Sequence, residues 1–445
     1  MLKGIFHIQA KRLNFKNTRF FASNSFAKYT QAQNYTSESY LEDSDRKELV
    51  MTLKQNGELG KAIEIFKNHG ITPSTIDPKP SLIYRDLEVT DYYLNFEESE
   101  KGSSLQKAVT ELKKMPECLT ITDIPKVPWF PQCISDFDQY NKILRMGDGI
   151  EQSDHIAFKD EDYVKRRNYI AEVGNSYSMD DPMIPTIDYN ENEKQTWKTW
   201  YRNIKKLYEH GACKEFTEEF AKFEKHCGLG EDKIPQLNDM SEYLLPRTGW
   251  RVRPVAGLLS TREYINGLAF KIFHWTQYIR HHSNPQFSPE PDGVHEILGH
   301  TPMLANKEFS DFSQRIGLAS LGCTDSELEK LGGIYNFTVE FGMCMEEGKK
   351  KAYGAAILTS FGEFEWAFSG KPSFLPFDCE EIAENHSKYL MASVQPCYFL
   401  AESFNDAKKK IIDYTDKMPK PFNSVYNEEE GVIEIDRKVR IGKNL

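Results

Sequence analysis

The sequence predicts an α+β protein in which a small βαββαβ unit precedes a larger, mostly α-helical domain. Two patterns carry this prediction. Between residues 45 and 117, segments that alternate apolar and polar residues, as strands do, are interspersed with segments of helical apolar spacing. From Glu193 onward, apolar residues recur mostly at a spacing of about 3.6. At 445 residues the chain is long enough for two or three domains. We expect domains at residues 45–117 and 118–430, between a leader or tail (1–44) and a short C-terminal arm (431–445).

Within the first unit, each expected element has its own signal. Residues 49–53 alternate like a strand, residues 61–69 carry apolar side chains at helical spacing, and Gly70 ends that helix. The elements expected to follow are a strand at 72–77, a turn at 78–80, a strand at 91–96 and a helix at 104–114.

The larger domain is expected to hold several amphipathic helices and few strands. Helical spacing is found at residues 196–208, 215–227, 240–245, 261–278 and 401–414. Residues 432–436 alternate like a short strand.

Composition limits the possible partners. The net charge of −11 argues against nucleic acid, and no apolar stretch approaches the roughly 18 residues of a membrane helix. The eight cysteines form no C-x-x-C pair, so they suggest no zinc cluster. The first 37 residues hold six basic residues and no acid. This is typical of a transit peptide, here for the mitochondrion; the alternative is a disordered tail on a cytoplasmic protein.

Two histidines and one distant glutamate form the strongest chemical signal. His295 and His300 lie five residues apart, and Glu340 follows forty residues later in an apolar run. Two imidazoles and one carboxylate are the ligand set of a facial Fe(II) site with open positions. A zinc peptidase would instead space its histidines four apart. The alternative without a metal is a pair of helix-end histidines with backbone partners.

The spacing of the two histidines also has a structural consequence. On an ideal helix, at about 100° per residue, His295 and His300 would point roughly 140° apart. The helix must therefore end or loosen before His300, and Gly299 is the expected place.

Three segments around these residues resemble the iron-binding segments of the aromatic amino acid hydroxylases, a pterin-dependent family. They are residues 288–292, 295–300 and 335–342, and the similarity runs from about residue 127 to residue 421. The resemblance implies Fe(II) bound by His295, His300 and Glu340. It further implies O2 as co-substrate and tetrahydrobiopterin or a reduced folate as the source of two electrons. The N-terminal unit is similar to the ACT regulatory domain found in animal members, so an amino-acid sensor and a purely structural unit both remain open.

The same resemblance assigns further site residues. Glu296 would be catalytic and face the pterin, which would lie between one set of residues (Gly257, Leu259, Thr261, Tyr264, Ile265) and another (Gly332, Tyr335). Arg280 would hold the substrate carboxylate, because a guanidinium binds a carboxylate bidentately; its alternative role is an ordinary surface ion pair. The remaining substrate-binding residues would be Ser288, Ser360, His274, Pro291 and Phe341. Asp292, Glu290 or backbone carbonyls are expected to orient the ligand histidines.

Several positions bear on the substrate. Asn336 stands where relatives usually carry Trp or Phe, and Met146 where relatives that act on phenylalanine commonly carry Tyr. The resemblance also implies a substrate without a phenol, because His274 stands in place of Gln and Met391 stands where relatives that act on tyrosine carry an acidic residue. L-Phenylalanine is therefore the expected substrate and tryptophan the second choice. A metal-dependent hydrolase and an inactive amino-acid sensor are the remoter alternatives.

The sequence also suggests an oligomeric state. Relatives with four subunits end in a long apolar heptad helix, whereas this sequence ends at residues 441–445 without one. The expectation is a homodimer, or a monomer, in preference to a tetramer.

Overall fold

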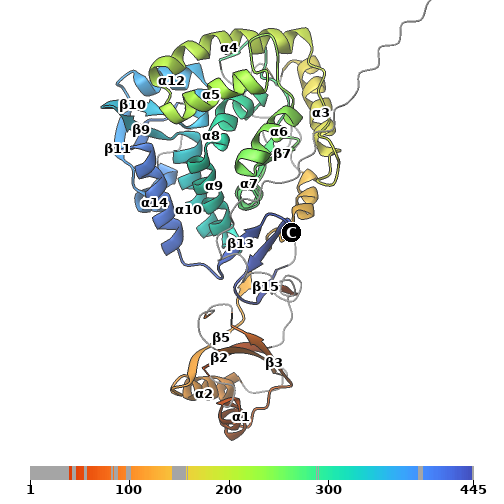
Figure 1. Ribbon diagram of the computed structural model, residues 1–445, viewed down its shortest axis with the longest axis vertical. Helices are drawn as coiled ribbons and strands as arrows, with labels where there is room; N and C mark the ends of the chain where they lie inside the picture. The colour runs from red at the N-terminus through yellow and green to blue at the C-terminus, as the bar shows by residue number, and fades with distance from the viewer. Residues whose placement is uncertain are drawn as a thin grey trace, which may run out of the picture.

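The computed structural model describes residues 40–42, 47–54, 58–81, 84, 89–96, 102–142, 157, 159–286, 288, 290–388 and 394–442. Most of the expected leader or tail, together with Met146 and Met391, lies outside these residues. The described chain forms a small N-terminal domain below a larger helical domain (Figure 1). None of its described helices is both long and apolar enough to cross a bilayer.

The N-terminal domain is a four-stranded antiparallel sheet with two helices. Its elements are β2 (Lys47–Leu53), α1 (Leu59–Asn68), β3 (Thr75–Pro80), β4 (Thr90–Phe96), α2 (Gly102–Leu112) and β5 (Cys118–Asp123). The strand order is β3-β4-β2-β5. Met51, Phe66 and Leu94 are fully buried between sheet and helices. The βαββαβ order is therefore as predicted.

Two details of this domain differ from the sequence prediction. Residues 78–80 are not a turn: β3 continues through Pro80 in register with β4. The prolines are tolerated because β3 is an edge strand, where a missing N–H removes no sheet hydrogen bond. The boundary at residue 117 is also too early, because β5 pairs with β2 and extends the sheet to Asp123.

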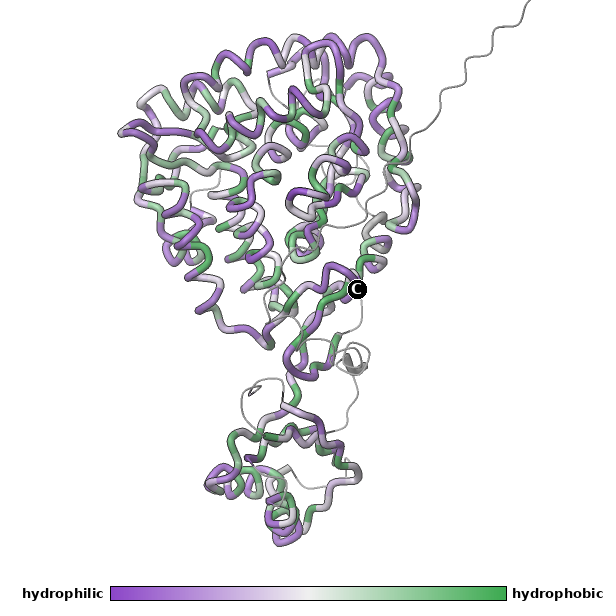
Figure 2. Tube along the Cα trace, in the orientation of Figure 1, coloured by the Kyte–Doolittle hydropathy of each residue, from purple (hydrophilic) through white to green (hydrophobic). Residues whose placement is uncertain are grey.

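The larger domain surrounds a core that includes the fully buried Trp200, Trp250 and Trp275. Along its outer helices, hydrophilic and hydrophobic residues alternate (Figure 2). The helices are η3 (Ile134–Lys142), α3 (Glu161–Asn175), α4 (Glu191–Gly211), α5 (Lys214–His226), α6 (Leu237–Thr248), α7 (Thr261–Ala269), η5 (His295–His300), α8 (Thr301–Ala305), α9 (Lys307–Ser320), α10 (Asp325–Tyr335), η6 (Asn336–Glu340), α11 (Ala355–Leu358), α12 (Phe361–Phe368), α13 (Cys379–Asn385), η7 (His386–Lys388) and α14 (Phe404–Lys417). The strands are β7 (Arg251–Pro254), β8 (Ile272–Trp275), β9 (Met343–Glu346), β10 (Lys349–Ala352), β11 (Ser373–Pro376), β12 (Cys397–Ala401), β13 (Ser424–Asn427) and β14 (Val432–Ile435).

The expected helix at 261–278 is wrong in its second half. Helix α7 ends at Ala269, and after Lys271, which has a φ of 53°, the chain enters β8. All four residues of β8 are buried, and the strand pairs in parallel with β7. A strand buried on both faces has no alternating pattern, so periodicity alone does not separate it from a helix.

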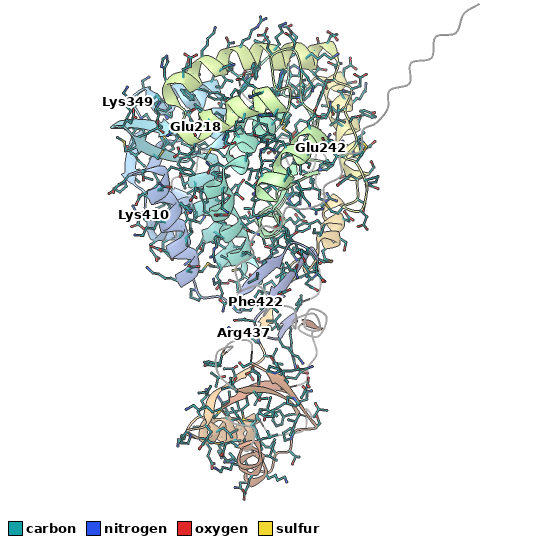
Figure 3. The ribbon with its side chains drawn as sticks, viewed as in Figure 1. Glu218, Glu242, Lys349, Lys410, Phe422 and Arg437 are labelled. Atoms are coloured by element: carbon teal, nitrogen blue, oxygen red, sulfur yellow. The ribbon has the colours of Figure 1, made fainter. Side chains whose placement is uncertain are left out.

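The C-terminal arm is built into the junction between the two domains. Strand β15 (Val439–Ile441) lies between β1 (Tyr40–Glu42) and β6 (Lys126–Val127) in a parallel sheet. Around it, the Arg440 guanidinium lies 3.3 Å from the Glu48 carboxylate. Figure 3 places Arg437 at this junction, with Phe422 just above it. The last described residues therefore link the two domains and do not form a free arm.

Candidate active site

The two histidines lie on one widened helical turn. Helix η5 is a π-helix, in which the N–H of Thr301 donates to the carbonyl of Glu296 five residues earlier. This wider turn brings positions five apart onto one face. The Nε2 atoms of His295 and His300 are consequently 2.9 Å apart. The predicted loosening of the helix is thus realised as a π-turn.

Gly299 does not end this helix, contrary to the sequence prediction, because the chain continues directly into α8. Its role is close packing. A Cβ atom at this position would lie 2.8 Å from the Cβ of Ala355 and 2.9 Å from the Cγ2 of Thr359. The missing side chain therefore lets the π-turn approach α11.

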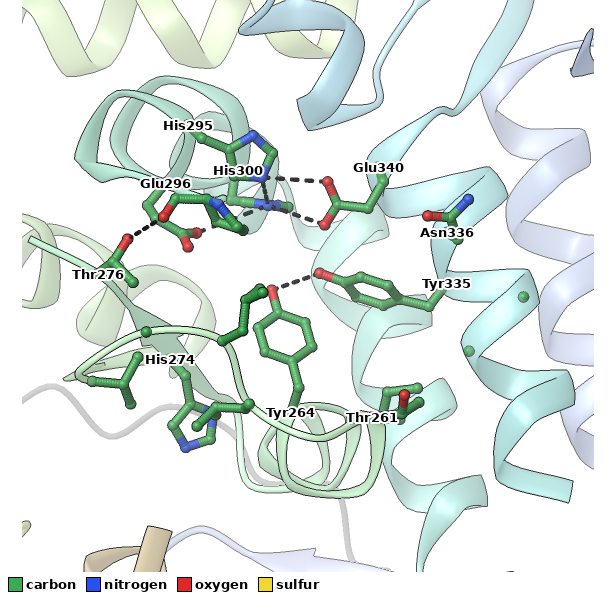
Figure 4. Close-up of a pocket in the computed structure, with 18 of the residues that line it drawn as sticks. Thr261, Tyr264, His274, Thr276, His295, Glu296, His300, Tyr335, Asn336 and Glu340 are labelled. Carbon is green, nitrogen blue, oxygen red and sulfur yellow. Dashed lines mark hydrogen bonds and ion pairs between the residues drawn. The ribbon is translucent and has the colours of Figure 1, made fainter. Parts of the chain in front are cut away.

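Glu340 reaches the same point from a second π-turn. Helix η6 carries a hydrogen bond of 2.8 Å from the N–H of Phe341 to the carbonyl of Asn336. The two carboxylate oxygens of Glu340 lie 3.3 Å from His295 Nε2 and 3.3 Å from His300 Nε2. Figure 4 shows the three side chains converging.

These separations suit a metal ion. Two neighbouring ligands with bonds of about 2.1 Å at a right angle lie about 3 Å apart, and all three distances are close to that value. The donor set itself, two imidazoles and one carboxylate, is the one that holds non-haem Fe(II) with open positions. The three residues therefore fit an iron ion.

Thr359 orients the first ligand. Its Oγ1 lies 2.9 Å from Nδ1 of His295 and donates to the carbonyl of Ala355, so it accepts from the imidazole N–H. This arrangement leaves the lone pair of His295 Nε2 directed toward the metal position. Asp292, Glu290 or backbone carbonyls are the partners expected from the sequence, whereas the structure has the Thr359 hydroxyl in this place and gives both carboxylates other partners.

Asp292 and Glu290 form buried ion pairs. Glu290 accepts two hydrogen bonds of 3.0 and 2.9 Å from Arg167. Asp292 accepts from Nε of Arg280 at 3.0 Å and from Nη2 at 2.7 Å. Asp292 also accepts from the backbone N–H of His295, at 3.1 Å. It therefore fixes the start of the π-turn and not an imidazole ring.

The electrostatics favour the metal-binding protonation states. Burial by itself raises the pKa of Glu340, but the neighbouring His300 and His295 outweigh it and hold that pKa well below its usual range. Burial lowers the pKa of His300. An anionic carboxylate and a neutral imidazole are the forms that bind a metal. Burial and the charges of Glu340 and Asp292 raise the pKa of Glu296 well above its usual value.

The ligands open onto a cavity of about 430 Å³. All eight residues assigned to the pterin by resemblance are among those that line it: Gly257, Leu259, Thr261, Tyr264, Ile265, Glu296, Gly332 and Tyr335. The hydroxyl groups of Tyr264 and Tyr335 are 2.6 Å apart and join the two sides (Figure 4). Segments far apart in sequence thus form one wall around the metal position.

The substrate residues named from the sequence divide into two groups. His274 and Pro291 line the cavity, whereas Arg280, Ser288, Phe341 and Ser360 are not among its lining residues. Arg280 is only 4% exposed, which excludes the surface ion pair considered as its alternative role. Ser288 donates to the carbonyl of Glu290, and Ser360 caps helix α12.

Six further residues line the cavity without having been named from the sequence. They are Val255, Leu258, Thr276, Glu329, Gly333 and His386. Thr276 lies two residues after His274, a spacing that puts strand residues on one face, and Gly333 is the neighbour of Gly332. His386 comes from η7 and has no comparable sequence signal.

The fold and the site define a mononuclear non-haem iron enzyme of the two-histidine, one-carboxylate class. Residues 128–444 match the model of the biopterin-dependent aromatic amino acid hydroxylases. The chain belongs to this family.

Relatives with curated names and solved structures agree. The chain is 41% identical to phenylalanine-4-hydroxylase of Caenorhabditis elegans over 420 residues, 91% of each chain. Against tryptophan 5-hydroxylase of Xenopus laevis it is 41% identical over 416 residues, covering 91% of this chain and 86% of that one. A point mutant of phenylalanine hydroxylase from Chromobacterium violaceum superposes with a TM-score of 0.50 at 29% identity, covering 57% of this chain and 88% of that chain.

We predict that Thr359→Val weakens Fe(II) binding by about 10- to 100-fold, because losing the partner of a ligand histidine typically has this effect. Anaerobic Fe(II) titration would measure it. Thr415→Val is the matched control, since Thr415 is a buried threonine of α14 whose hydroxyl donates to the helix carbonyls of Ile411 and Ile412. Equal iron affinity in the two variants would contradict the role of Thr359.

Proposed function

We propose that the protein hydroxylates L-phenylalanine to L-tyrosine, using Fe(II), O2 and tetrahydrobiopterin or a reduced folate. The observation that carries this proposal is the convergence of His295, His300 and Glu340 at a cavity lined by the residues that the family uses for its pterin. The named relatives support phenylalanine as substrate. Because the tryptophan 5-hydroxylase is equally identical at 41%, overall identity does not separate the two amino acids.

The iron, once bound, would activate O2 with two electrons from the reduced pterin. The protein's own groups prepare this site. Glu340 stays anionic, and Thr359 fixes the ring of His295. Leu259 and Ile265 make part of the cavity wall apolar. Glu296 and the paired hydroxyls of Tyr264 and Tyr335 supply polar groups toward the pterin.

Arg280 is the proposed anchor for the substrate carboxylate. Asp292 holds its guanidinium from one side, and Nη1 donates to the carbonyl of Thr359 at 3.1 Å. The hydroxyl of the same Thr359 bonds to His295. The guanidinium is thus buried and held in place, and Thr359 links it to the iron ligand His295. The other residues proposed to contact the substrate are Ser288, Ser360, His274, Pro291 and Phe341.

Three wider assignments belong to the same proposal. The N-terminal sheet would be an ACT-like regulatory domain, as its βαββαβ order suggests. The protein would act as a homodimer in the mitochondrion, or else in the cytoplasm. An inactive sensor is disfavoured, because it requires a lost iron ligand and all three ligands converge.

The test is an assay of tyrosine formation from phenylalanine by the anaerobically Fe(II)-loaded protein, supplied with O2 and tetrahydrobiopterin. Tyrosine should appear with the wild type and be lost with His295→Ala. A parallel assay with tryptophan sets the preference. Exclusive formation of 5-hydroxytryptophan would overturn phenylalanine as substrate, and turnover without O2 or pterin would favour a hydrolase.

Asn336 yields a prediction about affinity for the aromatic ring. It lines the cavity, and its buried Nδ2 has no hydrogen-bond partner among the described residues. Asn336→Phe should restore a stacking contact worth ~0.5–1.5 kcal/mol, which lowers the KM for phenylalanine by about 2- to 12-fold.

Steady-state kinetics would measure this effect. Asn336→Leu is the matched control, because it is apolar but cannot stack, and it should lower the KM less. A KM that falls equally in both variants would show that removing the amide matters and stacking does not.

A further inference from the structure

A second group of potential metal ligands lies apart from the iron site. It consists of Asp160, His281 and His282, with one ligand atom of each residue within 4.8 Å of the others. None of these residues lines the cavity. The group joins the start of helix α3 to the chain segment that follows Arg280.

The ring of His281 is held firmly in this group. Its side chain is only 2% exposed. Nδ1 lies 2.7 Å from the hydroxyl of Ser283, and Nε2 lies 3.1 Å from Oδ2 of Asp160. Two ligands of a tetrahedral site with bonds of about 2.1 Å lie about 3.4 Å apart, which is close to this separation of 3.1 Å. The backbone N–H of Ser283 also donates to Nδ1, at 3.2 Å, so in the metal-free protein the ring donates from Nε2 to Asp160.

The two oxygens of Asp160 have separate tasks. Oδ1 caps helix α3 by accepting from the N–H groups of Asp162 and Tyr163, at 3.0 and 3.1 Å. Oδ2 is directed to His281. The side chain of Asp160 is 33% exposed. The ring of the exposed His282 is tilted by 31° against that of His281, with 4.3 Å between the ring centroids. An ion can therefore arrive from solvent without disturbing the helix cap.

We propose that Asp160, His281 and His282 form a second metal site, which binds a divalent transition-metal ion such as Zn²⁺ with water as the fourth ligand. Two imidazoles and a carboxylate suit zinc, with solvent completing a tetrahedron. The ion would lie between His281 Nε2 and Asp160 Oδ2, and the ring proton would move from Nε2 to Nδ1, where the Ser283 hydroxyl can accept it. Binding at this site does not depend on the proposed function.

The site would clamp α3 to the segment that carries the substrate arginine. Along one face of α3, the hydroxyl of Tyr163 donates to the carbonyl of Ile279 at 3.0 Å, and Arg167 pairs with Glu290. Their partners, Ile279 and Glu290, lie before and after Arg280 in the sequence. An ion at the start of the helix would add a third fixed point to this packing, so it should raise the thermal midpoint of unfolding.

Zinc binding to the iron-loaded protein tests the proposal. After anaerobic dialysis against buffered Zn²⁺, metal analysis should find one zinc per chain in addition to the iron. His282→Gln and Asp160→Asn should each weaken this binding at least tenfold. Asparagine is as good an N-cap as aspartate, so Asp160→Asn removes the anionic ligand and keeps the helix cap. His210→Gln removes an exposed histidine of α4 and should change nothing.

A second arm uses His295→Ala, which disables the iron site and should still take up the same zinc equivalent. The proposal is overturned if no additional zinc binds, if zinc enters only in exchange for iron, or if the His282 and Asp160 variants bind it as the wild type does.

Discussion

The buried carboxylate of Asp292 is the interaction on which the site depends. It is fully buried and accepts from the Arg280 guanidinium, from the backbone N–H of Arg280 at 2.7 Å and from the backbone N–H of His295. One side chain thus sets both the proposed substrate anchor and the first residue of the iron-binding turn. Removing one partner of such a buried ion pair lowers the free energy of unfolding by ~3–5 kcal/mol, because the other charge stays buried and unpaired.

The two π-turns are the second constraint. In an α-helix, His295 and His300 would point away from each other, whereas the π-turn places their Nε2 atoms 2.9 Å apart. Glu340 ends the other π-turn. The sequence allowed the ligands to be named and a loosened helix to be predicted. It did not show that the helix would widen and continue, because Gly299 serves equally well as a helix end and as a point of close packing.

The same limit applies elsewhere in the chain. The order of the N-terminal elements followed from apolar spacing, but the edge position of β3, which tolerates Pro78 and Pro80, depends on strand pairing that spacing does not encode. The residues proposed to face the pterin were identified by resemblance, and in the structure they line one cavity. The partners of Asp292 and Glu290 could not be predicted, because each ion pair joins segments whose relative placement is set by the tertiary fold.

The most direct test of this account is to measure iron affinity and the KM for phenylalanine together in Asp292→Asn, with the fold checked by circular dichroism. The account predicts that a folded variant binds Fe(II) more weakly, because the π-turn that carries His295 loses its anchor. It also predicts a raised KM, since the amide cannot hold the Arg280 guanidinium as a carboxylate does. A folded variant with wild-type iron affinity and an unchanged KM would contradict the claim that Asp292 positions both the substrate anchor Arg280 and the iron-binding turn that begins at His295.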